Sequence, residues 1–161
     1  MNIEAVGLSW TREANIIIGQ SHFIKTVEDI AEIMASSNPA IKYGLAFNEA
    51  SGPCLVRTSG NDAALVKDAE TCALKTGAGH TFYLVIGSGG FPINVLDRIK
   101  QCQEVCCIFC ATANPVQVVV ARTEQGAGIL GVIDGNSPKG IETEKDKEDR
   151  RAMLRQFGYK F

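Results

Sequence analysis

The sequence predicts an α/β (α+β) fold, a single domain over residues 1–161 in which helices flank a mixed β-sheet. Short apolar runs rich in β-branched residues have the length of buried strands. They alternate with longer segments whose apolar residues recur every three or four positions, as on one face of a helix. A turn at residues 48–53 between two strand-like segments indicates a hairpin. This pattern predicts helices packed on a sheet with both parallel and antiparallel strands.

The first quarter of the chain predicts two strands and a helix. Residues 2–9 alternate loosely between apolar and polar, as in an edge strand, and residues 16–18 have the composition of a buried strand. Thr26 is a good N-cap for the following helix, because apolar residues then recur at helical spacing up to Met34. The segment Ser36-Ser37-Asn38-Pro39 ends this helix.

The rest of the chain continues the alternation. Further strands are expected at residues 43–47, 54–57, 79–86, 105–110, 116–121 and 128–133. Further helices are expected at about residues 61–75, 92–100 and from 143 onward. Asn61 and Thr143 are the expected N-caps, and Gly77 is the expected helix stop. The last helix carries Met153 and Phe157 on an apolar side, opposite a run of charged residues typical of a solvated face.

Composition narrows the class of protein. The formal net charge of −2 argues against a nucleic-acid binder that depends on a basic surface, so no nucleic-acid partner is expected. No apolar run approaches the ~20 residues that a membrane helix needs. The N-terminus also lacks a basic segment followed by an apolar one. We therefore expect no membrane partner and a cytoplasmic location.

Four of the six cysteines lie within residues 102–110. In a strand, Cys107 and Cys110 point to opposite faces, so this C-x-x-C pair cannot easily close on one zinc ion. Both histidines are far away in the sequence. We expect small buried thiols here and assign no metal ligands.

The junction between the strand at residues 16–18 and the helix after it is a candidate phosphate site. Gln20, His22 and Lys25 stand at the mouth of the helix N-terminus, where backbone N–H groups and the helix dipole favour an anion. His22 is the candidate phosphoryl acceptor, and Lys25 is the candidate phosphate ligand. The alternative is that His22 only satisfies a backbone carbonyl at a crowded turn.

Three further loops meet this junction if the preceding strands run parallel, because ligands bind beyond the carboxyl ends of such strands. One loop offers Asn48, Glu49 and Ser51, with Glu49 as a general base or a Mg²⁺ ligand, or merely as a solvated carboxylate. The other two loops offer glycine amides and polar side chains, namely Gly87, Ser88, Gly89, Gly90, Thr112 and Asn114. Together these groups form a reasonable set for holding and moving a phosphoryl group.

His80 is the alternative to His22. It lies between a helix stop and a strand and follows Gly79, so a ligand could approach its ring closely. On the parallel-sheet assumption, it lies at the opposite strand end from the four loops, unless a neighbouring subunit brings them together. Residues 126–131 satisfy G-x-G-x-x-G but continue as a strand, and no G-x-x-x-x-G-K-[ST] occurs. Neither a Rossmann nor a P-loop fold is therefore expected.

Seven longer segments of the chain resemble the adenosine-specific kinase family of small prokaryotic proteins. They are Gly19–Asp29, Gly44–Pro53, Gly77–His80, Phe91–Leu96, Ala111–Pro115, Gly128–Gly135 and Ser137–Gly140. The resemblance covers nearly the whole chain and implies an adenine-nucleotide site, a phosphohistidine and assembly as a homotrimer. A basic residue often stands in the family where Ala127 stands here, so one phosphate contact of the family is not expected in this chain.

The predicted function is that of an adenine-nucleotide-binding phosphotransferase, adenosine kinase-like, with a phosphohistidine. ATP or AMP is the expected ligand, with Mg²⁺ possible, and adenosine as acceptor comes from the resemblance alone. Two alternatives stay open. A non-catalytic adenosine or AMP sensor would bind nucleotide without turnover, whereas a hydrolase using a histidine and Glu49 would release inorganic phosphate.

Overall fold

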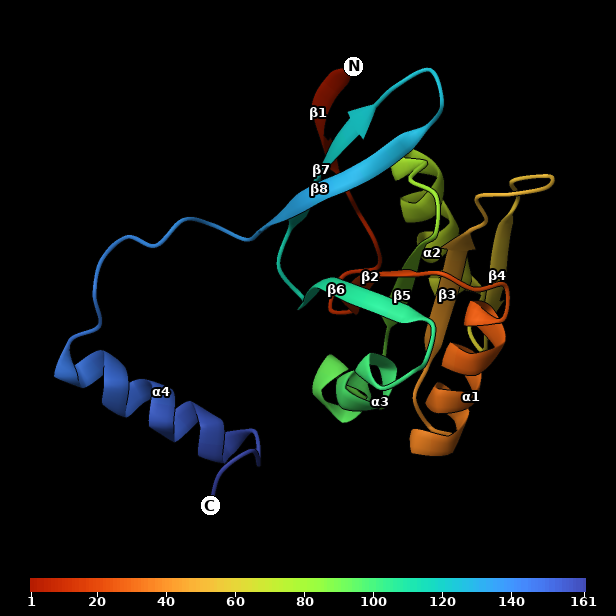
Figure 1. The fold of residues 1–161 in the computed structure, drawn as a ribbon. Coiled ribbons are helices and arrows are strands. Elements are labelled where there is room, and N and C mark those ends of the chain that lie inside the picture. Colours follow the sequence, from red (N-terminus) through yellow and green to blue (C-terminus); the bar gives the residue numbers. More distant parts are fainter.

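Two antiparallel β-sheets form the body of the computed structural model, which describes residues 1–161 (Figure 1). The larger sheet has five strands in the order β4-β3-β5-β2-β6, and the smaller has three in the order β1-β7-β8. The strands are β1 (Asn2–Gly7), β2 (Asn15–Ser21), β3 (Tyr43–Asn48), β4 (Val56–Gly60), β5 (Thr81–Ile86), β6 (Val105–Thr112), β7 (Val116–Arg122) and β8 (Ala127–Asp134).

Helices cover both faces of the larger sheet. The helices are α1 (Thr26–Ser37), α2 (Ala63–Thr76), the 3-10 helix η1 (Pro92–Asn94), α3 (Leu96–Lys100) and α4 (Glu144–Gln156). Residues of α1 and α3 pack on one face, and residues of α2 and β7 pack on the other. By contrast, α4 stands apart from the body at the end of an extended segment (Figure 1), and it has no buried residue. None of the helices combines the length and apolarity needed to cross a bilayer.

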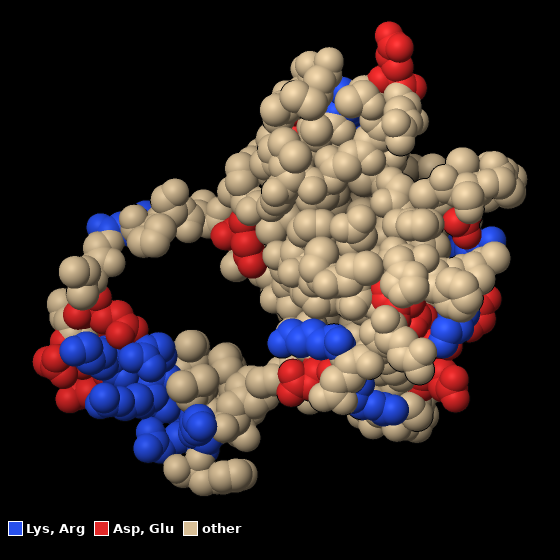
Figure 2. Space-filling model, in the orientation of Figure 1, with Lys and Arg blue, Asp and Glu red and all other residues tan.

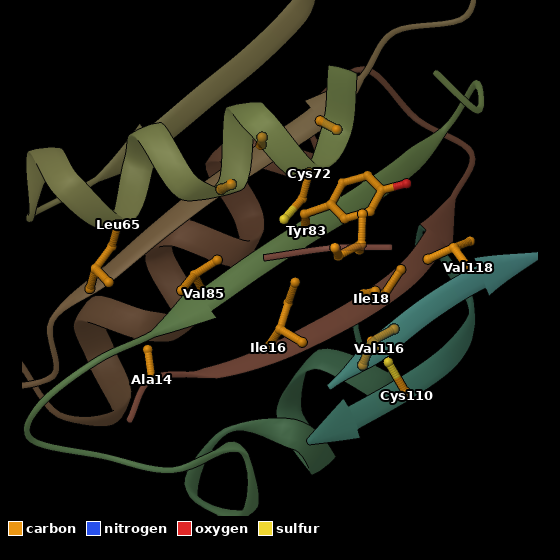
Figure 3. Close-up of a cluster of buried hydrophobic side chains, with 14 of the residues drawn as sticks. Ala14, Ile16, Ile18, Leu65, Cys72, Tyr83, Val85, Cys110, Val116 and Val118 are labelled. Carbon is orange, nitrogen blue, oxygen red and sulfur yellow. The ribbon is translucent and has the colours of Figure 1, made fainter. Parts of the chain in front are cut away.

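Alternate residues of the central strands supply the two halves of the core. In β2, Ile16 and Ile18 face α2 and the smaller sheet, whereas Ile17 faces α1. In β5, Tyr83 and Val85 pack with Ile16 and Ile18 in the half of the core that faces α2, which Figure 3 shows. These side chains are fully buried. Strands with both faces covered are near-continuous apolar runs, so residues 16–18 and 82–86 were recognisable in the sequence.

The predicted α+β class is confirmed, but the predicted mixture of strand directions is wrong in detail. Every strand pair is antiparallel, and the only parallel pairing is an isolated bridge between Ala78 and Ala127. Each of the first three α-helical connections joins two strands of the same direction, with one antiparallel strand inserted between them. The interleaved strand is the reason that an alternating strand and helix pattern gives no parallel pair here.

Several local predictions also need correction. Thr26 is the first residue of α1, with Lys25 at the cap position, and Asp62 rather than Asn61 caps α2 through the N–H groups of Ala64 and Leu65. The cysteine-rich strand was expected to be buried, but Cys106 and Cys107 are exposed, because β6 is at the edge of its sheet. The predicted cap at Thr143 and the stop at Gly77 are confirmed.

Candidate functional site

The ends of β2 and β3 and the beginnings of β5 and β6 meet at one edge of the larger sheet, which we call the histidine edge (residues 20–26, 48–57, 77–81 and 102–105). The N–H of Ser21 donates to the carbonyl of His80 over 3.0 Å, and the N–H of His80 donates to the carbonyl of Asn48 over 2.7 Å. The N–H of His22 donates to the carbonyl of Glu104 over 2.9 Å. Both histidines and the loop that follows β3 are therefore held at the same edge.

The assumption that four predicted loops share one edge is wrong. Since β5 and β6 run antiparallel to β2, their C-terminal ends lie beside Asn15 and Ile16, at the other end of that strand. The segments 87–90 and 112–114 follow these ends and form what we call the glycine edge. His80 precedes β5 and so lies beside Ser21 rather than at the opposite end.

Glu49 is the electrostatic centre of the histidine edge. Its side chain is 6% exposed; Oε1 accepts hydrogen bonds from the Ala50 N–H (3.1 Å) and the Ser51 hydroxyl (3.3 Å). Nε2 of His80 lies 3.6 Å from Oε1, and Nε of Arg57 lies 3.1 Å from Oε2. Burial opposes ionisation, but these hydrogen bonds and the Arg57 charge outweigh it and lower the pKa of Glu49. The carboxylate is therefore ionised at neutral pH.

His80 is held in a costly backbone conformation. Its φ of 58° is in the left-handed region, as is that of Cys54, at 50°. Such a conformation costs about 1–3 kcal/mol for a residue other than glycine and recurs at functional sites. The imidazole also stacks on buried Phe47, with ring centroids 5.8 Å apart and an interplanar angle of 14°. Phe47 and Glu49 together fix the ring from its face and from its edge.

A cavity of about 630 Å³ opens beside this pair. It lies between the end of α2, the β3–β4 hairpin and the β7–β8 turn, and its size suits a nucleoside or nucleotide. Glu49 and Gly79 line it directly, so the backbone next to His80 forms part of its wall. Apolar and polar groups of the other walls include Val56, Leu74, Gln125 and Ala127. His22 does not line this cavity.

His22 and Lys25 stand in a different environment. His22 is exposed, and the N–H groups of Val27 and Glu28 in the first turn of α1 have no backbone partner. Lys25 forms an ion pair with Asp29, and its Nζ lies 3.9 Å from Oε2 of Glu104. Lys25 is thus engaged by two carboxylates, and Glu28 and Asp29 add negative charge to the first turn of the helix beside His22.

The remaining predicted residues fall into two groups. At the histidine edge, Gln20 is exposed, and Nδ2 of Asn48 donates to the carbonyls of Ala73 and Ala78, both over 3.0 Å. At the glycine edge, segment 87–90 lines a second cavity of about 690 Å³ with Arg12 and Lys42.

The other predicted pair at the glycine edge is bonded to a carboxylate. The Thr112 hydroxyl and the Asn114 amide both donate to Oδ1 of Asp134. Thr112 and Asn114 therefore tie β6 to the end of β8 and are separated from Glu49 by the length of the sheet.

Arg57 and Phe47 were missed by the reasoning from sequence. The two residues are cross-strand partners in the β3–β4 hairpin. The sequence predicted this hairpin but placed its return strand at residues 54–57 instead of Val56–Gly60. With the correct register, Arg57 would have been expected next to the strand end that carries Glu49.

Comparison with known proteins identifies the family to which the chain belongs and a solved structure with the same fold. The family described as adenosine specific kinase matches residues 6–160, nearly the whole chain. The crystal structure of the PH1918 protein from Pyrococcus horikoshii OT3 superimposes with a TM-score of 0.94 at 42% sequence identity, covering 99% of this chain and 98% of that one. No curated protein matches. The chain therefore belongs to the adenosine-specific kinase family.

Proposed function

We propose that this protein transfers a phosphoryl group from ATP to adenosine at the histidine edge, through a phosphohistidine. Membership of the family supports a kinase-like function on adenosine and implies ATP as the phosphate donor. The observation that carries the proposal is the 3.6 Å contact between Glu49 and His80 beside a nucleotide-sized cavity. A buried, ionised carboxylate that faces an imidazole is an arrangement suited to proton transfer.

The cavity beside Glu49 offers a place for the nucleoside. Val56, Leu74 and Ala127 supply an apolar wall for a purine, and Gln125 supplies an amide for its polar edge. The phosphates would lie toward Arg57, His80 and exposed His22. Mg²⁺ would neutralise charge on the phosphates when bound. Glu49 already pairs with Arg57 and contacts His80, so we assign it to orienting His80 for proton transfer and not to the metal.

The two histidines take different roles in the proposed reaction. A nitrogen of exposed His22 attacks the γ-phosphorus of ATP, the bond from that phosphorus to the bridging oxygen breaks, and ADP leaves with the electron pair. A ribose hydroxyl of adenosine then attacks the same phosphorus, and the P–N bond breaks with its electrons returning to His22. His80, oriented by Glu49, takes the hydroxyl proton.

A homotrimer, which the family resemblance implied, is part of the proposal. The exposed fractions of Ile141, Phe157 and Phe161 are 97%, 61% and 108%, so the C-terminal segment leaves apolar surface uncovered. A helix of this length is marginal by itself in water, and most helices are stabilised by packing of one face. Figure 2 shows a broad face of the body with few charged residues, which could receive the same segment of a neighbouring copy.

Incubation with γ-labelled ATP tests the proposal. We expect acid-labile, alkali-stable label on the wild type, loss of that label in His22→Ala, and retention of label without transfer to adenosine in His80→Ala. If only His80→Ala lost the label, His80 would be the phosphoryl acceptor and His22 would take the hydroxyl proton. Nucleotide affinity without label or product would overturn the kinase and leave an adenosine or AMP sensor, and release of inorganic phosphate alone would identify a hydrolase.

A further inference from the structure

A cluster of potential metal ligands lies at the far side of the histidine edge from the Glu49 and His80 pair, where α1 begins and β6 begins. Asp29 projects from the first turn of α1, and Cys102 and Glu104 come from the segment that joins α3 to β6. One ligand atom from each of these three residues lies within 4.8 Å of the others. The Cys102 thiol donates to Oε2 of Glu104 over 3.1 Å. The cluster thus brings one sulfur and two carboxylates together.

Glu104 is the observation that points to a ligand. Its side chain is 1% exposed, and Oε1 has no hydrogen-bond partner. A buried carboxylate oxygen without a partner is costly, because the charge loses its water and receives nothing in exchange. The nearest ammonium, Nζ of Lys25, lies 3.9 Å from the other oxygen and is already paired with Asp29. Oε1 of the buried carboxylate therefore has no polar partner, and Oε2 shares the one nearby ammonium with Asp29.

We propose that Asp29, Cys102 and Glu104 bind a thiophilic divalent cation of the zinc class, with water completing the coordination. A thiolate with carboxylates suits Zn²⁺, whereas Mg²⁺ prefers oxygen ligands only. The charges also match. Two carboxylates and a thiolate set against the Lys25 ammonium leave two negative charges, which one divalent cation neutralises. On binding, the thiol proton is released to solvent.

The cation has a route to the cluster. A cavity of about 330 Å³, lined by Lys25, Asp29 and Cys102, opens beside it to solvent. The three ligands belong to segments that are distant in sequence, so the cation would join α1 to the start of β6. The carbonyl of Glu104 also accepts the His22 N–H. The site is separate from the Glu49 and His80 pair, and it does not depend on the proposed transferase reaction.

Cobalt(II) is a spectroscopic probe for this site, because a bound thiolate gives a sulfur-to-cobalt charge-transfer band. We titrate reduced, metal-free full-length protein with Co²⁺ and expect one equivalent to produce the band and one equivalent of Zn²⁺ to abolish it. Cys102→Ser should remove the band. Cys107→Ser, which changes an exposed cysteine of β6, is the matched control and should keep it.

Two further variants distinguish a metal site formed by all three residues from Co²⁺ bound to the thiol alone. Glu104→Gln should weaken Co²⁺ binding about tenfold or more. Lys25→Met removes the competing cation and should strengthen Co²⁺ binding, a gain that a folding defect cannot produce. Absence of a band in the wild type, a band retained in Cys102→Ser, or binding weakened in Lys25→Met would each overturn the proposal.

Discussion

Nε2 of His80 lies 3.6 Å from Oε1 of Glu49, although one residue precedes a strand and the other follows a strand. Antiparallel pairing of β3 with β5 produces this contact, because the end of one strand then meets the beginning of the next. The same pairing stacks the imidazole on Phe47. The candidate site is thus a direct product of the sheet topology.

Replacing Glu49 by glutamine tests the electrostatic role of this contact. The amide has nearly the same shape but no charge, so His80 loses the carboxylate that orients it. We expect kcat for phosphoryl transfer to fall about 100-fold, the low end for general acid–base catalysis, with a smaller change in KM.

The control for this experiment is Glu70→Gln on α2, where the carboxylate pairs only with Lys67 at the surface. This variant should retain wild-type kcat, because a surface ion pair contributes little. Equal activities of the Glu49→Gln variant and the wild type would exclude the proposed proton transfer.

Gly44 gives a prediction about stability. An added Cβ would lie 2.0 Å from the carbonyl carbon of Leu65 and 2.1 Å from the N of Val66, both in the backbone of α2. The helix would have to move away from the sheet. We expect Gly44→Ala to lower the free energy of unfolding by about 3 kcal/mol or more in urea titrations, the upper range for overpacking.

Gly128 provides the matched control, because an added Cβ there meets nothing within 4 Å. Gly128→Ala should change the free energy of unfolding by less than about 0.5 kcal/mol. Equal stability of the two variants would contradict the close packing of α2 on β3 at Gly44.

Residues 16–18 and 82–86 show what local sequence can predict. Their apolar runs are buried on both faces, so composition alone identifies them as strands. The end of α2 at Gly77 was also predictable from the local sequence, because its left-handed φ of 59° favours glycine. Elements with such signals were placed to within a few residues.

Strand order was not predictable in the same way. The insertion of β5 between β3 and β2 depends on long-range packing, and no feature of residues 81–86 specifies their neighbours. The site prediction inherited this error. Gly87 and Thr112 were grouped with Glu49 because parallel strands were assumed, whereas Arg57 was missed because the return strand of the hairpin was placed at residues 54–57, with no register assigned.

The buried thiols predict loss of stability at high pH. Burial raises the pKa of Cys72 to about 11 and that of Cys110 to about 12, from an ordinary value of 9.0. The folded state therefore holds these protons where the unfolded state has lost them. This contribution is complete below pH 9 and is lost as the pH rises toward 11–12. At pH 10 we expect a loss of about 1 kcal/mol for each thiol.

Urea unfolding at several pH values measures this loss. Cys72→Ala should reduce the fall in the free energy of unfolding above pH 9, whatever its effect at neutral pH. Cys54→Ala, which removes an exposed thiol, should leave the fall unchanged. The same alkaline slope in both variants would show that other groups dominate it.

Substituting the exposed apolar residues of the C-terminal segment should change the assembly state. The C-terminal segment contacts the body through the aromatic rings of Tyr159 and Phe91. Met153 and Phe157 are 46% and 61% exposed. If a neighbouring copy buries both apolar side chains, each contributes about 1.5–3 kcal/mol per subunit. By light scattering, we expect the wild type to be trimeric and the double variant Met153→Lys, Phe157→Lys to be monomeric at the same concentration.

Glu148→Lys is the control for that measurement, because it also adds a lysine to α4 but replaces an exposed charged residue. It should remain a trimer. A monomeric wild type would leave the apolar residues of α4 without a partner, and a trimeric double variant would place the subunit contact elsewhere. Comparing label transfer in the monomeric variant with the wild type then decides whether the histidine edge of one subunit is sufficient for phosphoryl transfer. Full activity in the monomer would show that it is, since every proposed group from His22 to Glu49 comes from one chain.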